Sequence, residues 1–371
     1  MILKYPVGNQ TDLQPLPKPP GSWPFRLDIQ DITSCEPTQA VDTMEFHLVG
    51  DTGSRRQPEF QRRVARAMGA QIQSDGKGRK GPHFLLHLGD IVYDHGEAHE
   101  YASQFFMPYE NYPAPVLALA GNHDGDINPA GPVYGSLDAF MAVFCDTQPR
   151  PLAFSGGSRR LSQIQPHVYW SLRTPLANFI CLYGNISKFG YIDDTQFDWL
   201  LHELRTFGRE KGEKVLFLCL HHAPYSADIN HGSSRYMIDR LERAFALSGV
   251  LPDVVCSGHV HNYQRFSKQY PTGETVRYLV SGAGGYADLH RIADPDDGQV
   301  LDDPDRFKGV TLENYCDTQH GFLKMHIERG EKLTLTAEYY VVQSHSGPND
   351  ATAALFERTT FAVERSKAHS G

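Results

Sequence analysis

The chain has 371 residues, of which 40% are apolar and 21% are charged, a composition typical of a soluble globular protein with one large domain or two ordinary ones. Its formal net charge of −9 argues against a general nucleic-acid or anionic-membrane binder, because such partners favour basic surfaces. A phosphate-bearing ligand would therefore need local positive charge, and the 18 histidines make bound metal ions a natural source of it.

Residues 1–43 carry five prolines between positions 15 and 24 and are expected to form an extended N-terminal arm. The arm lacks the apolar core of a signal peptide, and no run in the chain reaches the ~18 apolar residues of a membrane-spanning helix. The six cysteines have no paired spacing, which is typical of buried reduced thiols. We therefore expect a cytoplasmic protein that binds neither nucleic acid nor membrane.

After the arm, short apolar runs alternate with helical patterns. Nearly continuous apolar runs predict strands covered on both faces at 46–51, 83–90, 116–122, 215–222 and 253–259. Apolar periodicity predicts helices at 56–69, 97–107, 193–212 and 233–248. Hairpins are predicted at 167–184 and 321–342. This order of elements predicts an α/β fold, a sandwich of two packed sheets with outer helices.

Each of the five predicted strands ends in side chains that can bind metal ions. In chain order these are Asp51, then Asp90 and Tyr93, then Asn122, His123 and Asp124, then His221 and His222, then His259 and His261. Loops at the carboxyl ends of strands in α/β sheets gather around one crevice, so we expect these groups to converge. Carboxylate, amide, phenol and imidazole groups suit iron, zinc or manganese rather than a thiolate site. Each motif alone also fits an ordinary turn, but all five in this order predict a metal centre.

In this order the motifs resemble those of the calcineurin-like metallophosphoesterases, and among them those of the purple acid phosphatases. The pattern DxG, GDxxY, GNH(D/E), VxxH and GHxH matches residues 51–53, 89–93, 121–124, 218–221 and 258–261, with Leu218 in place of Val as the single departure. The resemblance implies the metallo-dependent phosphatase fold, a four-layer α/β/β/α sandwich of two mixed sheets flanked by helices. Residues 44–345 would be the catalytic domain and residues 346–371 a C-terminal tail, while the acidic stretch 294–305 would be a surface loop or a lid.

Gly53 and Tyr93 distinguish the purple acid phosphatases from most of the superfamily. Most members have a His ligand at the position of Gly53, and the subgroup resembled here replaces it with a Tyr at the position of Tyr93. A phenolate is a hard, anionic donor, which favours a trivalent ion such as Fe³⁺. The alternative for Tyr93 is that it packs beneath the loop without binding metal.

The resemblance implies two metal ions. The first, Fe³⁺, would be held by Asp51, Asp90, Tyr93 and His261, and the second, Fe²⁺, Zn²⁺ or Mn²⁺, by Asp90, Asn122, His221 and His259. Asp90 would bridge them with one oxygen for each ion, at the ~3.5–4 Å separation of two-metal hydrolases.

The implied reaction is hydrolysis of a phosphomonoester in which a metal-bound hydroxide attacks phosphorus and His123 protonates the leaving group as general acid. Asp124 would orient His123 and support its charge. His231, ten residues after His221, would face the phosphate, with a surface position at a helix start as the equal alternative.

The substrate would be a small phosphorylated molecule or a phosphoprotein. A phosphodiesterase, for example of cyclic nucleotides, uses the same core, and the loops 125–165 and 286–320 would decide between the two activities. A non-catalytic adaptor with the same fold would have lost metal ligands, and none of the matched ligands is missing here. The sequence does not indicate an oligomeric state.

Overall fold

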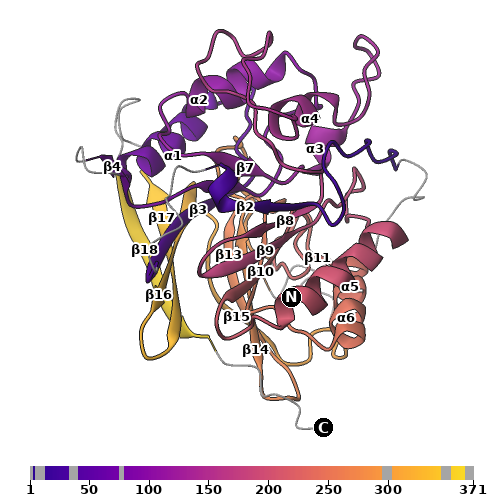
Figure 1. Cartoon of the computed structure of the whole chain (residues 1–371), viewed down its shortest axis with the longest axis vertical. Helices are drawn as coiled ribbons and strands as arrows, with labels where there is room; N and C mark the ends of the chain where they lie inside the picture. Colours follow the sequence, from indigo (N-terminus) through magenta and orange to yellow (C-terminus); the bar gives the residue numbers. More distant parts are fainter. Residues whose placement is uncertain are drawn as a thin grey trace.

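The computed structural model describes residues 3–4, 13–32, 41–74, 79–294, 303–343 and 352–363. Two large β-sheets form the centre of the molecule, and helices cover their outer sides (Figure 1). This architecture confirms the predicted α/β sandwich of two mixed sheets flanked by helices. Within the described ranges, no helix is both long and apolar enough to cross a membrane.

The six-stranded sheet has the strand order β18-β17-β16-β3-β6-β7. Three of its strands, β3, β6 and β7, are parallel, and the C-terminal strands β16, β17 and β18 add to it in antiparallel fashion. The carboxyl ends of β3, β6 and β7 therefore lie at the same edge. The bounds are β3(Thr43–Val49), β6(Leu85–His87), β7(Val116–Ala118), β16(Gly321–Arg329), β17(Leu333–Val342) and β18(Ala353–Ala362).

The eight-stranded sheet has the order β15-β13-β14-β12-β10-β9-β8-β2. Its strands β9, β10, β12 and β14 are parallel, and β8 and β9 form the predicted hairpin. The bounds are β2(Arg26–Asp28), β8(Trp170–Arg173), β9(Ala177–Cys181), β10(Val215–Leu220), β12(Val254–Ser257), β13(Tyr263–Gln269), β14(Thr275–Ser281) and β15(Val310–Cys316). Two short pairs join β1(Leu3–Lys4) to β11(Ser233–Ser234) and β4(Gln73–Ser74) to β5(Arg79–Lys80).

The three longest helices begin at a proline or at a capping side chain. α1(Pro58–Ala70) starts with a proline and contacts β16 and β17. α5(Asp194–Gly208) contacts β9 and is capped by Asp193, whose side chain accepts from the Gln196 N–H, while Ser234 caps α6(Arg235–Ser248) in the same way. The helix predicted at 97–107 runs over 100–109 instead, with a π-helical turn η3(Ala102–Phe106) before α2(Met107–Tyr109). The remaining short helices are η2(Ile29–Asp31), α3(Asn122–Gly125) and α4(Asp138–Phe144).

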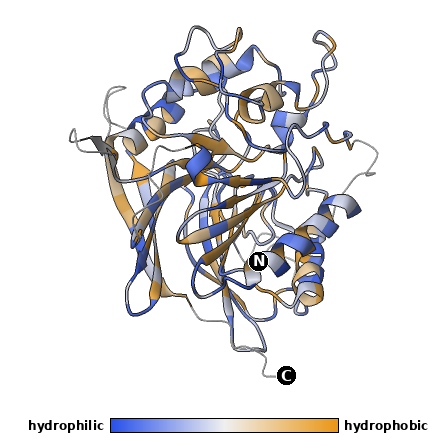
Figure 2. Cartoon of the chain, in the orientation of Figure 1, coloured by the Kyte–Doolittle hydropathy of each residue, from blue (hydrophilic) through white to orange (hydrophobic). Residues whose placement is uncertain are grey.

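Aromatic side chains fill the space between the two sheets. Phe46 of β3 stacks on Phe84, with ring centroids 5.1 Å apart, and Phe179 of β9 stacks on Phe217 of β10 at 4.7 Å. The two stacks meet edge to face, with Phe46 5.1 Å from Phe179. Figure 2 shows the hydrophobic residues concentrated along these central strands. Packing across the sandwich thus fixes how one sheet lies on the other.

Both terminal segments contribute strands to the sheets. β2 lies within the expected arm, 1–43, and pairs with β8, while β18 lies within the expected tail, 346–371, and pairs with β17. β18 is an edge strand whose residues are mostly exposed or half-buried, so its sequence lacks the apolar run of a central strand. Most of the acidic stretch 294–305 lies outside the described residues.

Candidate metal centre

The predicted ligands stand in the turns that follow β3, β6, β7, β10 and β12. Asp51, Asp90 and His259 have φ angles of 57°, 53° and 68°, a left-handed conformation that is uncommon for residues other than glycine. Strained backbone of this kind concentrates at functional sites, where the surrounding structure holds the residue in place. Sharp turns on a rigid sheet, rather than long loops, therefore present these side chains.

Asp51, Asp90, Tyr93 and His261 form a first group of converging atoms. The Tyr93 hydroxyl donates to Asp90 Oδ2 at 2.9 Å and lies 3.4 Å from Asp51 Oδ1 and 3.3 Å from His261 Nε2. Nε2 of His261 is 3.7 Å from Oδ1 of Asp51. All four side chains are buried. The structure thus brings together the four residues that we expected to hold the first ion.

Asp90, Asn122, His221 and His259 form a second group beside the first. Nε2 of His221 is 3.2 Å from Asn122 Oδ1, 3.3 Å from Asp90 Oδ2 and 3.3 Å from His259 Nδ1. Ligand atoms of Asp90, His221 and His259 all lie within 4.8 Å of one another, close enough to surround one cation. These are the four residues expected to hold the second ion.

Asp90 joins the two groups through one oxygen. Its Oδ2 faces both Tyr93 and His221, whereas Oδ1 accepts the backbone N–H of His123 at 3.0 Å. The turn after β7 brings a main-chain donor onto Oδ1, and Oδ2 is the oxygen that faces both groups. That each oxygen of Asp90 serves a different ion stays a prediction.

Main-chain carbonyls fix the orientation of the imidazole ligands. Nδ1 of His221 lies 2.8 Å from the Leu88 carbonyl, and Nδ1 of His261 lies 3.0 Å from the Asp288 carbonyl. A carbonyl only accepts, so both Nδ1 atoms carry a proton, and Nε2 is the ring atom that faces the acidic cluster and can bind a cation. When a cation binds, it takes the place of the proton on Nε2 and is held between the imidazoles and the carboxylate oxygens.

The pKa shifts in the cluster also indicate a site for cations. Burial lowers the pKa of His221, but the carboxylates of Asp90 and Asp51 outweigh it and raise that pKa to about 9. Burial, Asp90 and Asp51 raise the pKa of the Tyr93 phenol well above its ordinary value, so its phenolate forms only beside strong positive charge. The donors therefore fit a pair of highly charged cations.

His123 and Asp124 are placed differently from each other. The His123 ring is half-buried, lies 4.4 Å from the Tyr93 ring and donates from Nδ1 to the Asp94 carbonyl at 2.7 Å. Asp124 is fully buried and accepts the N–H groups of Ile91, Val92 and Gly121. We expected Asp124 to orient His123, but these bonds show that Asp124 ties the two ligand-bearing turns together and that Asp94 orients His123.

A cleft of about 490 Å³ opens over both groups, and His123 and His231 line it together with most of the predicted ligands. The His231 ring is 4.2 Å from that of His259, and its buried Nδ1 has no hydrogen-bond partner among the described residues. The sequence reasoning did not single out six further lining residues: Ile186, Lys188, Asn230, Tyr286, Asp288 and His290. Three of these lie in the loop 286–320, which we expected to influence the choice of substrate.

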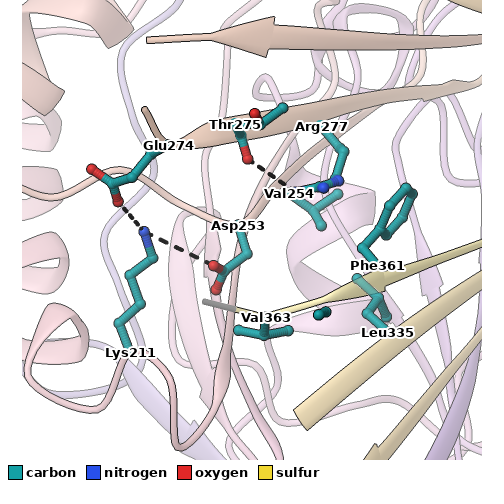
Figure 3. Close-up of a pocket in the computed structure, with 10 residues that line it drawn as sticks. Lys211, Asp253, Val254, Glu274, Thr275, Arg277, Leu335, Phe361 and Val363 are labelled. Carbon is teal, nitrogen blue, oxygen red and sulfur yellow. Dashed lines mark hydrogen bonds and ion pairs between the residues drawn. The ribbon is translucent and has the colours of Figure 1, made fainter. Parts of the chain in front are cut away.

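A second pocket lies between the C-terminal strand β18 and the start of β14 (Figure 3). Its charged groups pair with each other, since Lys211 Nζ is 2.8 Å from Glu274 and 3.9 Å from Asp253. With a volume of about 50 Å³ it is too small for a phosphorylated metabolite, and it contains none of the predicted ligands. These features fit a structural role.

Comparisons with known proteins agree with this geometry. The sequence model of the calcineurin-like phosphoesterases matches residues 44–263. Among solved structures, GAP50, the anchor in the inner membrane complex of Plasmodium, aligns over 88% of this chain and 91% of its own, with 12% identity and a TM-score of 0.58. PhoD aligns over 89% of this chain and 72% of its own, with 13% identity and a TM-score of 0.54. At such identities these structures show a shared fold alone, and none of the curated proteins matches the chain.

Proposed function

The chain belongs to the calcineurin-like phosphoesterase family, and within it we propose a dinuclear metal-dependent phosphomonoesterase of the purple acid phosphatase type. One observation carries the proposal: Asp90 Oδ2 lies within 3.3 Å of both the Tyr93 hydroxyl and His221 Nε2, between two complete groups of donors. The pairing of Gly53 with Tyr93 favours the purple acid subtype, because the phenol occupies the first group without a competing imidazole at position 53.

We propose Fe³⁺ at the group that contains Tyr93 and Fe²⁺, Zn²⁺ or Mn²⁺ at the group that contains Asn122. A buried phenol with a raised pKa binds as phenolate only to a strongly polarising ion, which supports the trivalent assignment. When bound, the two ions would neutralise phosphate charge and acidify a coordinated water molecule.

The protein's own residues supply the remaining steps. Because Nδ1 of His123 donates to the Asp94 carbonyl, the protonated ring offers its Nε2–H to a leaving-group oxygen in the cleft. Lys188 at the cleft supplies a positive charge for an anionic substrate. A cleft of about 490 Å³ suits a small phosphorylated molecule. We propose that such a molecule is the substrate and that the protein acts in the cytoplasm.

Two alternatives remain distinct from this proposal. A phosphodiesterase would use the same donors. A non-catalytic adaptor would resemble GAP50, a protein of the same fold that is described as an anchor. Both groups of metal donors are complete in this chain, which argues against an adaptor.

The test is metal analysis combined with two substrates. We expect the aerobically purified chain to contain two metal ions, to hydrolyse p-nitrophenyl phosphate faster than its bis-ester, and to show a broad visible absorption band. Tyr93→Phe should abolish the band, because the phenolate is its source. Tyr191→Phe removes a phenol outside both donor groups and serves as the matched control. Less than one metal ion per chain would support the adaptor, and faster hydrolysis of the bis-ester would support the diesterase.

A further inference from the structure

One wall of the cleft consists of two loops, 226–232 and 288–293, that are joined like neighbouring strands. Ala293 N–H donates to Ala227 O at 2.9 Å, and Ile229 N–H to Arg291 O at 3.2 Å. Asp228 and Ile292 face each other in an antiparallel bridge between these bonds. Because main-chain hydrogen bonds join the two loops, the side chains of this wall that face the cleft have fixed positions.

The Asp228 side chain lies between the two loops and is fully buried. Its carboxylate accepts the N–H groups of Asn230 at 3.0 Å, His231 at 3.0 Å and Gly232 at 2.7 Å, and its Oδ2 is 3.2 Å from Nδ1 of His290. Burial raises the pKa of Asp228, but the His290 hydrogen bond and the charges of His231 and His290 bring it down to about 2. A single carboxylate therefore holds the turn that carries His231 and the ring of His290.

His231 and His290 lie side by side at the cleft, with ring centroids 4.9 Å apart. Each also rests on a predicted metal ligand: His231 is 4.2 Å from His259, and His290 stacks on His261 at 4.2 Å and 24°. The backbone of His290 is fixed as well, since its N–H donates to His261 O and its carbonyl accepts from Asn262. The two imidazole rings thus lie beside the metal centre, along one wall of the cleft.

A phosphate ester needs donors for the oxygens that the metal ions leave uncovered. Among the described residues that line the cleft there is no arginine and only one lysine, Lys188. This wall offers the side-chain amide of Asn230 and the imidazoles of His231 and His290 as further donors, and an imidazole N–H also carries positive charge when the ring is protonated, which suits a phosphate oxygen.

We propose that His290 is a further substrate-contacting residue and that Asp228 is a positioning residue, which holds His290 and His231 as a pair against a phosphate-bearing substrate. The inference rests on the proposed function, because it takes a phosphate ester as the ligand of the cleft. His290, the residue proposed to make this contact, lies 29 residues after His261 in the chain and outside the five motifs.

The experiment compares His290→Gln and Asp228→Asn with the unaltered metal-loaded protein. Binding of inorganic phosphate is measured by titration calorimetry and as competitive inhibition of p-nitrophenyl phosphate hydrolysis, with the metal content of each sample determined. His326→Gln is the matched control. His326 lies on β16, outside the residues that line the cleft, and its Nδ1 is also 3.2 Å from a carboxylate, that of Glu45.

Both variants should bind phosphate about tenfold more weakly and show a similar rise in KM, as expected for the loss of a hydrogen bond to a charged group. The value of kcat should change less, and the metal content and the control should remain at the level of the unaltered protein. His290→Gln leaves the amide bonds of Asp228 intact, so it decides the question if Asp228→Asn fails to fold.

Phosphate binding within about twofold of the unaltered protein in His290→Gln would overturn the inference. Loss of metal from that variant would also overturn it, because His290 would then act on His261 and not on substrate. If the unaltered chain binds phosphate but hydrolyses no phosphoester, the proposed function fails, and the calorimetry still tests the contact with His290.

Discussion

At the scale of single residues, main-chain carbonyls orient three of the imidazoles at the site. Leu88, Asp94 and Asp288 each offer a carbonyl to Nδ1 of His221, His123 and His261 respectively. A carbonyl is present whatever the side chain, so no residue type in the sequence marks these partners. The tautomer of each ring, and hence its chemistry, is set by where the fold places the backbone.

His123 is the residue whose role is most open to a kinetic test. As general acid it should matter most when the leaving group is a poor one, so His123→Gln should slow hydrolysis of an alkyl phosphate by about 10²–10⁴-fold. With p-nitrophenyl phosphate, whose leaving group needs little protonation, the loss should be much smaller. The measurement is kcat/KM for both substrates in the variant and the unaltered protein.

His95→Gln is a suitable control for that experiment. Nδ1 of His95 lies 2.8 Å from Oδ2 of Asp126, and His95 is not among the residues that line the cleft. Its substitution should affect both substrates equally. Equal losses for the two leaving groups in His123→Gln would mean that His123 binds the phosphate rather than protonating the product.

At the scale of elements, the site depends on turns that approach each other closely. In the turn between β7 and α3, a Cβ added at Gly121 would lie 2.0 Å from Asp90 Oδ1 and 2.3 Å from the Asp90 backbone nitrogen. Gly121→Ala should therefore displace the shared carboxylate and lower the bound metal below two ions per chain. Elemental analysis and kcat/KM measure this effect.

Gly69→Ala provides the control for Gly121→Ala. Gly69 lies in the last turn of α1, and the nearest atom to an added Cβ is 3.8 Å away. Alanine is favoured over glycine there by up to about 1 kcal/mol, so the variant should keep its metal and unfold at a slightly higher temperature. Full metal occupancy in Gly121→Ala would show that the turn relaxes around the added methyl group.

The sequence predicted those elements whose signal is local. Continuous apolar runs indicated β3, β6, β7, β10 and β12, and the motifs at their ends named both groups of donors. β2 was missed because three residues in a proline-rich segment form no pattern, and β18 because an edge strand is largely exposed. The pair of Asp228 and His290 was missed because their contact spans 62 residues with no spacing that marks it.

At the scale of the whole molecule, the metal centre lies across both sheets. Asp51, Asp90 and Asn122 follow strands of the six-stranded sheet, whereas His221 and His259 follow strands of the eight-stranded one. Each group of donors combines residues from both sheets. The geometry at the ions therefore depends on how one sheet packs on the other, and the aromatic cluster of Phe46, Phe84, Phe179 and Phe217 determines that packing.

Phe179→Ala should reveal this dependence although Phe179 is not among the donor or cleft-lining residues. Removing a buried phenylalanine costs about 3–5 kcal/mol of unfolding free energy, and the cavity loosens the contact between the sheets. We expect weaker metal binding together with the loss of stability, measured by urea unfolding and by metal titration. Leu355→Ala, at a side chain 45% exposed on β18, should change neither by more than about 0.5 kcal/mol. If Phe179→Ala lost stability but bound both ions with unchanged affinity, the turns alone would hold the metal geometry, independently of the sheet packing.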